Sequence, residues 1–195
     1  MWQINIDETS LGYKFPAFIF ISLEKQQSKN FDKFPWSKNK EHLKKWKEGK
    51  TGIPIVDAGM REMLATGWMH NRLRMIVAMF LSKNLLTNWQ EGEKYFMENL
   101  IDGDFASNNG GWQWSASTGT DAAPYFRIFN PVTQSQNFDS EGRFIKKYLP
   151  QLASLNDKEI HLPSPEHLYE IDYPSQIVDL KSSRLRAIEV FKANK

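Results

Sequence analysis

The residues best suited to carry chemistry gather between positions 101 and 126, which read IDGDFASNNGGWQWSASTGTDAAPYF. This stretch combines two tryptophans separated by one residue with carboxylates, amides and many small side chains. It shows no apolar period of 2 or 3.6 residues, so we predict a long loop, and such loops are usually functional. Small residues let a backbone approach a flat ligand, polar ones orient it, and tryptophan stacks on it. These residue types suit a planar heteroaromatic cofactor or a nucleobase.

Other kinds of site fit the sequence less well. The chain has no cysteine, which excludes disulfides, thiolate metal sites and a cysteine nucleophile. DGDFASNNGGWQ lacks the alternating oxygen ligands and terminal glutamate of an EF-hand, and neither a P-loop nor a Gly-x-Ser-x-Gly motif occurs. Without the two tryptophans, DGD and NNGG would be interpreted as capped turns. His70 has no histidine near it in the sequence, and a histidine of this kind is more often structural than a metal ligand. We predict no metal site.

The whole chain is expected to form a folded, cytoplasmic protein. It has 195 residues, enough for one domain or two small ones, and is 41% hydrophobic and 13% aromatic, unlike a disordered chain. A formal net charge of +2 permits an anionic partner without requiring one. The N-terminus lacks the features of a signal peptide, and the most apolar run, FPAFIFISL, is too short to cross a bilayer. We expect no membrane partner.

Helices are predicted for most of the remaining chain, so the expected fold class is all-α with long functional loops. The predicted helices are 39–49, ended by Gly49; 51–67, capped by Thr51 or Gly52 and ended by Gly67; 70–86; 88–101, softened or broken at Gly92; 141–149; and 180–195. Residues 127–139 are expected to form a loop, and prolines interrupt 161–174.

The helix predicted for residues 70–86 presents two stripes. Its buried face consists of Leu73, Ile76, Val77, Phe80 and Leu81. Beside that face, Asn71, Arg74, Met75 and Ala78 form a second stripe that is polar at its N-terminal end. Residues 24–50 are rich in lysine, which indicates a solvated surface or a surface that faces nucleic acid.

Two segments carry a resemblance to a known family: GIPIVDAGMREMLATGWMHNRLRMIVAMFL and IDGDFASNNGGWQWSASTGTDAAPYFRIFNP. They closely resemble the C-terminal, FAD-binding helical domain of the DNA photolyase/cryptochrome family, and most of all the bacterial cyclobutane pyrimidine dimer photolyases. The resemblance is dense from about residue 34 to residue 149 and returns weakly at 172–193. It implies a flavoprotein lyase of DNA repair, in which light drives an electron from reduced FAD to a pyrimidine dimer flipped out of damaged DNA.

The resemblance also implies roles for individual residues. The positions that match the family's flavin-binding residues are Asn71, Arg74, Asp102, Gly103, Asp104 and Asn108. Arg74 matches the arginine that pairs with the first aspartate of DGD, and Asn108 matches the residue that faces flavin N5. An asparagine there is typical of photolyases rather than cryptochromes. Trp36, Trp89 and Trp112 match the three-tryptophan chain that passes electrons to the flavin. Without the resemblance, each of these tryptophans would be interpreted as a residue of the hydrophobic core.

The positions that match the dimer pocket and its rim are Asn71, Arg72, Met75, Trp114, Arg127 and Gln134. Trp114 is expected to stack on the flipped bases, and the two arginines are expected to face phosphate or carbonyl oxygens.

The chain departs from the family in length. A whole photolyase is more than twice as long and begins with an α/β domain that carries an antenna chromophore, which is not expected here. The segment that cradles the FAD pyrophosphate and the Trp-Arg-Glu helix are missing, and residues 1–33 show little likeness to the family. We therefore expect residues 34–195 to be the C-terminal part of a FAD-binding domain, a monomer that binds FAD weakly or not at all.

Three hypotheses stay open at this point. The chain is a fragment of a photolyase, a cryptochrome-like flavin photosensor, or a non-catalytic remnant without full FAD binding. Asn108, Met75 and Trp114 argue against the photosensor, and the missing FAD segments favour the remnant.

Overall fold

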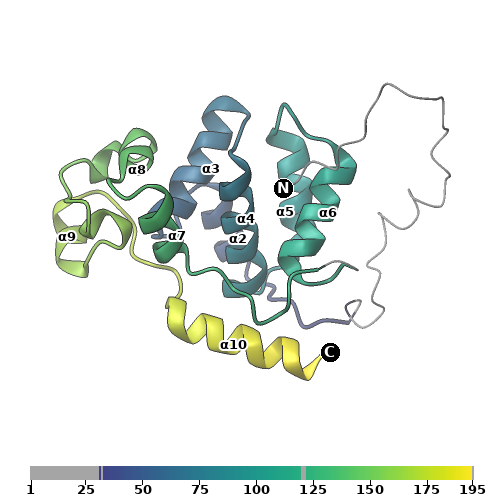
Figure 1. Cartoon of the computed structure of the whole chain (residues 1–195). Coiled ribbons are helices and arrows are strands. Elements are labelled where there is room, and N and C mark those ends of the chain that lie inside the picture. The colour runs from purple at the N-terminus through teal and green to yellow at the C-terminus, as the bar shows by residue number, and fades with distance from the viewer. Residues whose placement is uncertain (1–30, 32, 120–121, 195) are drawn as a thin grey trace.

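The computed structural model describes residues 31, 33–119 and 122–194, and its elements there are helices (Figure 1). The longer helices are α2 (Lys40–Lys47), α3 (Pro54–Thr66), α4 (Asn71–Met79), α5 (Trp89–Asn99), α6 (Phe105–Ala116), α7 (Pro131–Phe138) and α10 (Leu180–Ala193). The shorter ones are η2 (Phe80–Asn84), α8 (Arg143–Tyr148), η3 (Pro150–Leu152), η4 (Glu159–His161) and α9 (Pro165–Glu170). One isolated β-bridge, Ser37 to Thr87, is the only β pairing in the described part. The all-α prediction is confirmed.

Helices α2 to α6 form the centre of the molecule (Figure 1). Helix α4 packs between α3 and α6, while α6 packs on α5 and α8 packs on α3. The main core fills the space between these helices with aliphatic, methionine and tryptophan side chains. Helix α10 crosses below the bundle and contacts η2, where Phe34, Leu86, Ala187 and Phe191 form a smaller apolar cluster (Figure 1). No described helix is long and apolar enough to span a membrane.

Helix α3 ends where the sequence predicts but begins differently. Gly67 adopts a left-handed conformation with φ of 70° and closes the helix, as expected of a C-terminal glycine. Neither Thr51 nor Gly52 is the N-cap, because that position belongs to Ile53, whose side chain makes no capping bond. Instead Asp57 reaches back and accepts hydrogen bonds from the backbone of both residues. The buried carboxylate therefore holds the two residues that precede Ile53, while the first turn of α3 has no side-chain cap.

The prediction of a loop over residues 101–126 is wrong for its central part, which forms helix α6. Asp104 is the N-cap, and its carboxylate accepts a hydrogen bond of 2.7 Å from the Ser107 backbone. The helix lies against α4 and α5, yet its buried face carries Asn108, Asn109 and Gln113 beside Trp112. Because that inner face is largely polar, the sequence shows no apolar period although the helix is packed.

The loop predicted for residues 127–139 is also wrong, since Pro131–Phe138 forms helix α7. Asn130 caps it by accepting hydrogen bonds from the backbone of Val132 and Thr133, and Pro131 occupies the first turn. The helix has eight residues, too short for an apolar period to stand out from the sequence.

Helix α5 continues through Gly92, so the predicted break is wrong. A Cβ at this position would lie 2.2 Å from Cη2 of Trp112 and 2.7 Å from Cδ2 of Leu81. Glycine is therefore required because the Trp112 indole packs directly on the helix backbone.

Replacing Gly92 with alanine is expected to destabilise the protein by about 1–3 kcal/mol, because the added methyl group overpacks the core. Gly110→Ala on α6 is the matched control. Its Cβ would meet nothing within 4 Å, so the same change is expected to be neutral or stabilising by up to about 1 kcal/mol. Urea unfolding of both variants measures this difference, and equal effects would contradict the contact with Trp112.

Helix α4 passes into one π-helical turn, η2, which contains a fully buried lysine. Burial lowers the pKa of Lys83 from 10.5 to about 7. Between these values the unfolded chain binds more protons than the folded chain, so the free energy of unfolding rises with pH.

We expect the free energy of unfolding to rise from pH 7 toward pH 10 by at most about 1.4 kcal/mol per pH unit through Lys83. The Lys83→Met variant should lack this contribution. Urea unfolding of both proteins at several pH values in this window gives the two slopes, and equal slopes would contradict the lowered pKa.

Candidate functional site

The N-terminal end of α4 presents the polar stripe that the sequence predicts. His70 caps the helix, and its Nδ1 accepts a hydrogen bond of 3.1 Å from the Arg72 backbone. Arg74 Nη2 donates to both carboxylate oxygens of Asp102, at 2.8 and 2.7 Å, and its Nε donates to the Met69 carbonyl. The predicted pairing of Arg74 with Asp102 is therefore present. Asn71 lies beside it, and its buried Oδ1 has no hydrogen-bond partner among the described residues.

The Asp102–Asp104 segment connects α5 to α6. The Asp102 side chain is 45% exposed while that of Arg74 is 17% exposed, so the pair lies at an open surface rather than in the core. Hydrogen bonds from the backbone and side chain of Ser107 lower the pKa of Asp104, which keeps its carboxylate charged. The segment therefore holds one paired carboxylate and one that caps a helix.

Asn108 is buried on α6, and its amide orientation follows from one contact. Its side-chain nitrogen donates a hydrogen bond of 2.9 Å to the Glu93 carbonyl on α5. Because a carbonyl only accepts, the nitrogen must face Glu93, which leaves the Asn108 Oδ1 as a free acceptor. Burial raises the pKa of the neighbouring Glu93 carboxyl, whose buried Oε1 has no hydrogen-bond partner among the described residues.

The three tryptophans predicted to pass electrons lie at different depths. Trp112 and Trp89 are fully buried in the main core, whereas Trp36 is half-buried against Phe34, at 4.3 Å between ring centroids. The rings that contact Trp112 are those of Phe96, at 5.0 Å, and Trp46, at 6.0 Å. The indole N–H groups of Trp36, Trp89 and Trp112 are buried without a described acceptor.

Trp112 and Trp114 point to different sides because they stand two residues apart on helix α6, about 200° around its axis. Trp112 is buried and Trp114 is partly exposed. The division that the sequence predicts between an inner and an outer tryptophan is thus present, although a helix rather than a loop produces it. Met75 on α4 is also partly exposed.

The basic residues predicted for the rim lie near α7. The Arg72 guanidinium lies 4.8 Å from the ring centroid of Phe138 and 6.0 Å from that of Phe129. Arg127 is exposed, and Gln134 on α7 is partly exposed with its Oε1 buried and unpartnered among the described residues. Arg72 therefore rests on aromatic rings that α7 and its leading segment provide.

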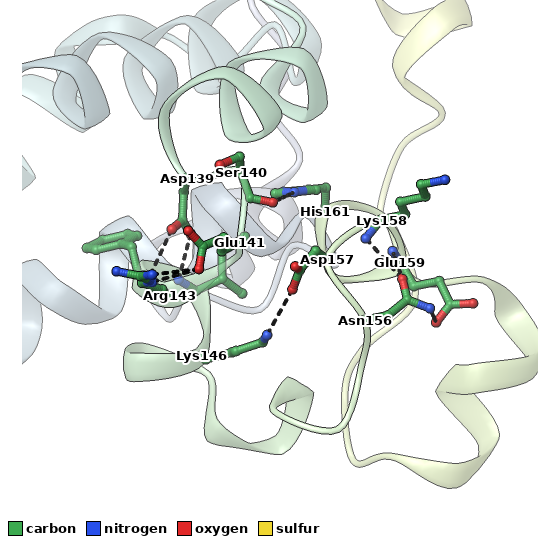
Figure 2. Close-up of polar contacts among 12 residues, drawn as sticks. Asp139, Ser140, Glu141, Arg143, Lys146, Asn156, Asp157, Lys158, Glu159 and His161 are labelled. Atoms are coloured by element: carbon green, nitrogen blue, oxygen red, sulfur yellow. Dashed lines mark hydrogen bonds and ion pairs between the residues drawn. The ribbon is translucent and has the colours of Figure 1, made fainter.

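A buried histidine, His161, holds helix α7 in place through a hydrogen bond with Ser135. His161 Nε2 lies 3.2 Å from the Ser140 carbonyl, so this nitrogen carries the proton and donates it (Figure 2). Nδ1 then accepts a hydrogen bond of 2.6 Å from the Ser135 hydroxyl on α7. Just after α7, the Asp139 carboxylate accepts hydrogen bonds from the backbone N–H groups of Phe144 and Ile145, which lie in the first turn of α8 (Figure 2).

The sequence analysis did not single out several residues that support the site. Lys83 is a buried and Glu93 a partly buried ionisable group beside α6, and Asp57 ties the start of α3 to Tyr173. A signal was available for Lys83, since a lone lysine inside the apolar run of residues 76–86 is unusual. No comparable signal marks Asp57, whose partner Tyr173 is distant in sequence.

Two cavities lie away from the expected flavin contacts. One, of about 530 Å³, lies between the start of α7 and the start of α10, and the other, of about 520 Å³, lies beside Arg61 and Tyr173. Neither is lined by a residue from the Arg74 and Asp102 surface. No group of three potential metal ligands occurs in the described ranges.

Comparisons with known proteins agree on one family. The family described as "FAD binding domain of DNA photolyase" matches residues 9–193. The chain is 56% identical over 165 residues to the deoxyribodipyrimidine photo-lyase of Escherichia coli, covering 83% of this chain. A bacterial class III photolyase from Agrobacterium tumefaciens superposes with a TM-score of 0.85 at 44% identity, over 91% of this chain and 39% of that one. A Synechocystis cryptochrome superposes with a TM-score of 0.79 at 36% identity, over 87% and 37%.

The chain spans about a third of the length of these relatives, 35% in the case of the Escherichia coli protein.

Proposed function

The chain belongs to the DNA photolyase family, and from this membership we propose that it is part of a light-driven, FAD-dependent enzyme that splits cyclobutane pyrimidine dimers in DNA. The observation that carries the proposal is the Arg74 and Asp102 pair, with 2.7 Å between Nη2 and Oδ2. A resemblance to photolyases predicts this contact between residues far apart in the sequence. An unrelated helical protein would not be expected to bring these two side chains into contact.

The side chains predicted to bind the flavin have the chemistry that a flavin requires. The Arg74 and Asp102 pair, the unpartnered oxygen of Asn71 and the oriented amide of Asn108 offer charged and neutral groups to a polar ring edge. Bound FAD would supply the light-absorbing, electron-donating chemistry of repair. The Arg74 and Asp102 pair lies on an open surface, and the chain corresponds to about a third of its relatives, so we expect this part alone to hold FAD weakly or not at all.

Asn108 acts by presenting an acceptor. Because its nitrogen is held by the Glu93 carbonyl, its Oδ1 is available to accept a hydrogen bond from a ring N–H. This orientation suits a reduced flavin, whose N5 carries a hydrogen. Arg74, held by Asp102 and by the Met69 carbonyl, keeps a positive charge at the N-terminal end of α4. Such a charge stabilises an electron-rich ring.

Trp112, Trp89 and Trp36 supply electrons for cofactor reduction in this proposal. Trp112 is the inner residue and Trp36 the outer one, as their burial indicates. Their indole N–H groups have no described acceptor, so an oxidised indole in this chain keeps its proton and passes the positive charge outward.

Damaged DNA is the proposed partner. Trp114 is partly exposed and stacks on the extruded bases, while Arg72, Arg127 and Gln134 contact the backbone and base edges at the rim. Arg72 is steadied by the ring of Phe138, so its guanidinium is oriented before DNA arrives.

The expected affinity for FAD tests the cofactor part of the proposal. The purified chain is expected to bind added FAD weakly and to lose it on dialysis, as an incomplete site must be ordered on binding. Arg74→Ala should abolish the residual flavin difference spectrum. Arg61→Ala is the control and should leave that spectrum unchanged, because the Arg61 Nε donates to the Gly49 carbonyl, away from the expected flavin contacts. Flavin retained at near one equivalent after extensive dialysis would contradict the weak binding.

The function itself is tested in a chimera that joins residues 34–195 to the N-terminal portion of the Escherichia coli relative, which this chain does not span. Under blue light the chimera is expected to split dimers in an oligonucleotide. A chimera that reduces its flavin but repairs nothing would favour the photosensor, and one that binds no flavin would favour the non-catalytic remnant.

A further inference from the structure

Lys83 occupies an unusual environment for a lysine. Its side chain is fully buried in the π-helical turn η2, and no described carboxylate forms an ion pair with it. The Lys83 Nζ instead donates a hydrogen bond of 2.7 Å to the Ser117 hydroxyl and lies 3.7 Å from the ring centroid of Phe191 on α10. A buried charge without a counter-ion is unfavourable, so an apolar side chain of similar length would serve packing better.

The contact of Lys83 with Ser117 falls at a strained point of the backbone. Ser117 has φ of 60° and ψ of 37°, a left-handed conformation that residues with a Cβ rarely adopt. It ends helix α6 three residues after Trp114. A serine at this position therefore needs support from its surroundings, and the only described hydrogen bond to its side chain comes from Lys83.

The chain reversal at Ser117 is organised around Trp114. The backbone N–H groups of Ser117 and Ala123 both donate to the Trp114 carbonyl, each at 3.2 Å, and that of Thr118 donates to the Gln113 carbonyl at 3.1 Å. These bonds connect the last turn of α6 to the segment that leads to Arg127. The conformation of Ser117 thus determines where the chain leaves Trp114.

We propose that Lys83 is a positioning residue, whose bond to Ser117 holds the left-handed end of α6 and so places Trp114 at the DNA-facing surface. The proposal rests on the proposed function for its consequence in DNA binding, but the structural step concerns this chain alone. The π-helical turn supports it, because such turns are frequent at functional sites.

Two variants test the proposal in the full chain. Lys83→Met removes the Nζ donor at similar side-chain length. Lys83→Met with Ser117→Gly also replaces the strained serine with a residue that adopts positive φ freely. Lys94→Met, on the exposed surface of α5, is the matched control. The first readout is amide hydrogen exchange at Ser117, Thr118 and Ala123. The second is binding to a duplex with one thymine dimer, compared with the undamaged duplex.

Lys83→Met is expected to speed exchange at the three amides and to weaken dimer binding, each by about tenfold, without loss of overall stability. The added Ser117→Gly change should restore most of the protection of these amides and most of the affinity for the dimer. A purely structural lysine would instead lower protection throughout the protein, and glycine would not rescue it. Either unchanged exchange at these amides or absence of rescue overturns the proposal. If the wild-type chain binds the damaged and the undamaged duplex equally well, that result counts against the proposed function. The hydrogen-exchange results still decide the role of Lys83.

Discussion

Replacing Trp114 with alanine is expected to weaken binding of dimer-containing DNA by about 5- to 150-fold, because one stack of a base on an aromatic ring contributes about 1–3 kcal/mol. Trp114 is partly exposed on the outer side of α6, so its removal should leave the core intact. Fluorescence anisotropy with a labelled duplex that contains one thymine dimer gives the affinity, and thermal unfolding shows whether the fold is kept.

Trp112→Phe is the matched control for this effect. Trp112 is fully buried against Phe96 and Trp46, and phenylalanine keeps most of that packing. The variant is therefore expected to spare DNA affinity. In a flavin-loaded chimera it should slow photoreduction, because phenylalanine is much harder to oxidise. If both variants show the same DNA-binding defect, the separation of an inner and an outer tryptophan is wrong.

Asp57→Ala is expected to lower the free energy of unfolding by at least about 3 kcal/mol, since it leaves several buried donors without an acceptor. The carboxylate accepts from the backbone of Thr51 and Gly52, at 2.7 and 3.0 Å, and from the hydroxyls of Thr51 and Tyr173, both at 2.6 Å. All these groups are buried, so water cannot take the place of the lost oxygen atoms. Urea unfolding measures the loss.

Asp139→Ala provides the comparison, because Asp139 also accepts two backbone hydrogen bonds but is only part-buried. Its loss should cost about 0.5–2 kcal/mol, as for other helix caps. Tyr173→Phe removes a single donor from Asp57 and should fall between the two variants. An Asp57→Ala cost no larger than that of Asp139→Ala would contradict the role of burial.

The sequence by itself determined the family, the all-α class and the pairing of Arg74 with Asp102. It also located most helices, since those with an apolar stripe and a terminal glycine, such as α3, carry their own boundaries. The inner and outer places of Trp112 and Trp114 followed from the same resemblance.

Only the tertiary structure decided which polar residues lie inside. Helix α6 escaped prediction because it buries amides that pair with α5 and with one another, and burial of polar groups leaves no apolar period. Gly92 looked like a helix breaker, but the Trp112 ring, twenty residues later, occupies the space a side chain would need. Lys83 likewise draws its contacts from α6 and α10. Each case depends on a partner distant in the chain, which local sequence patterns do not contain.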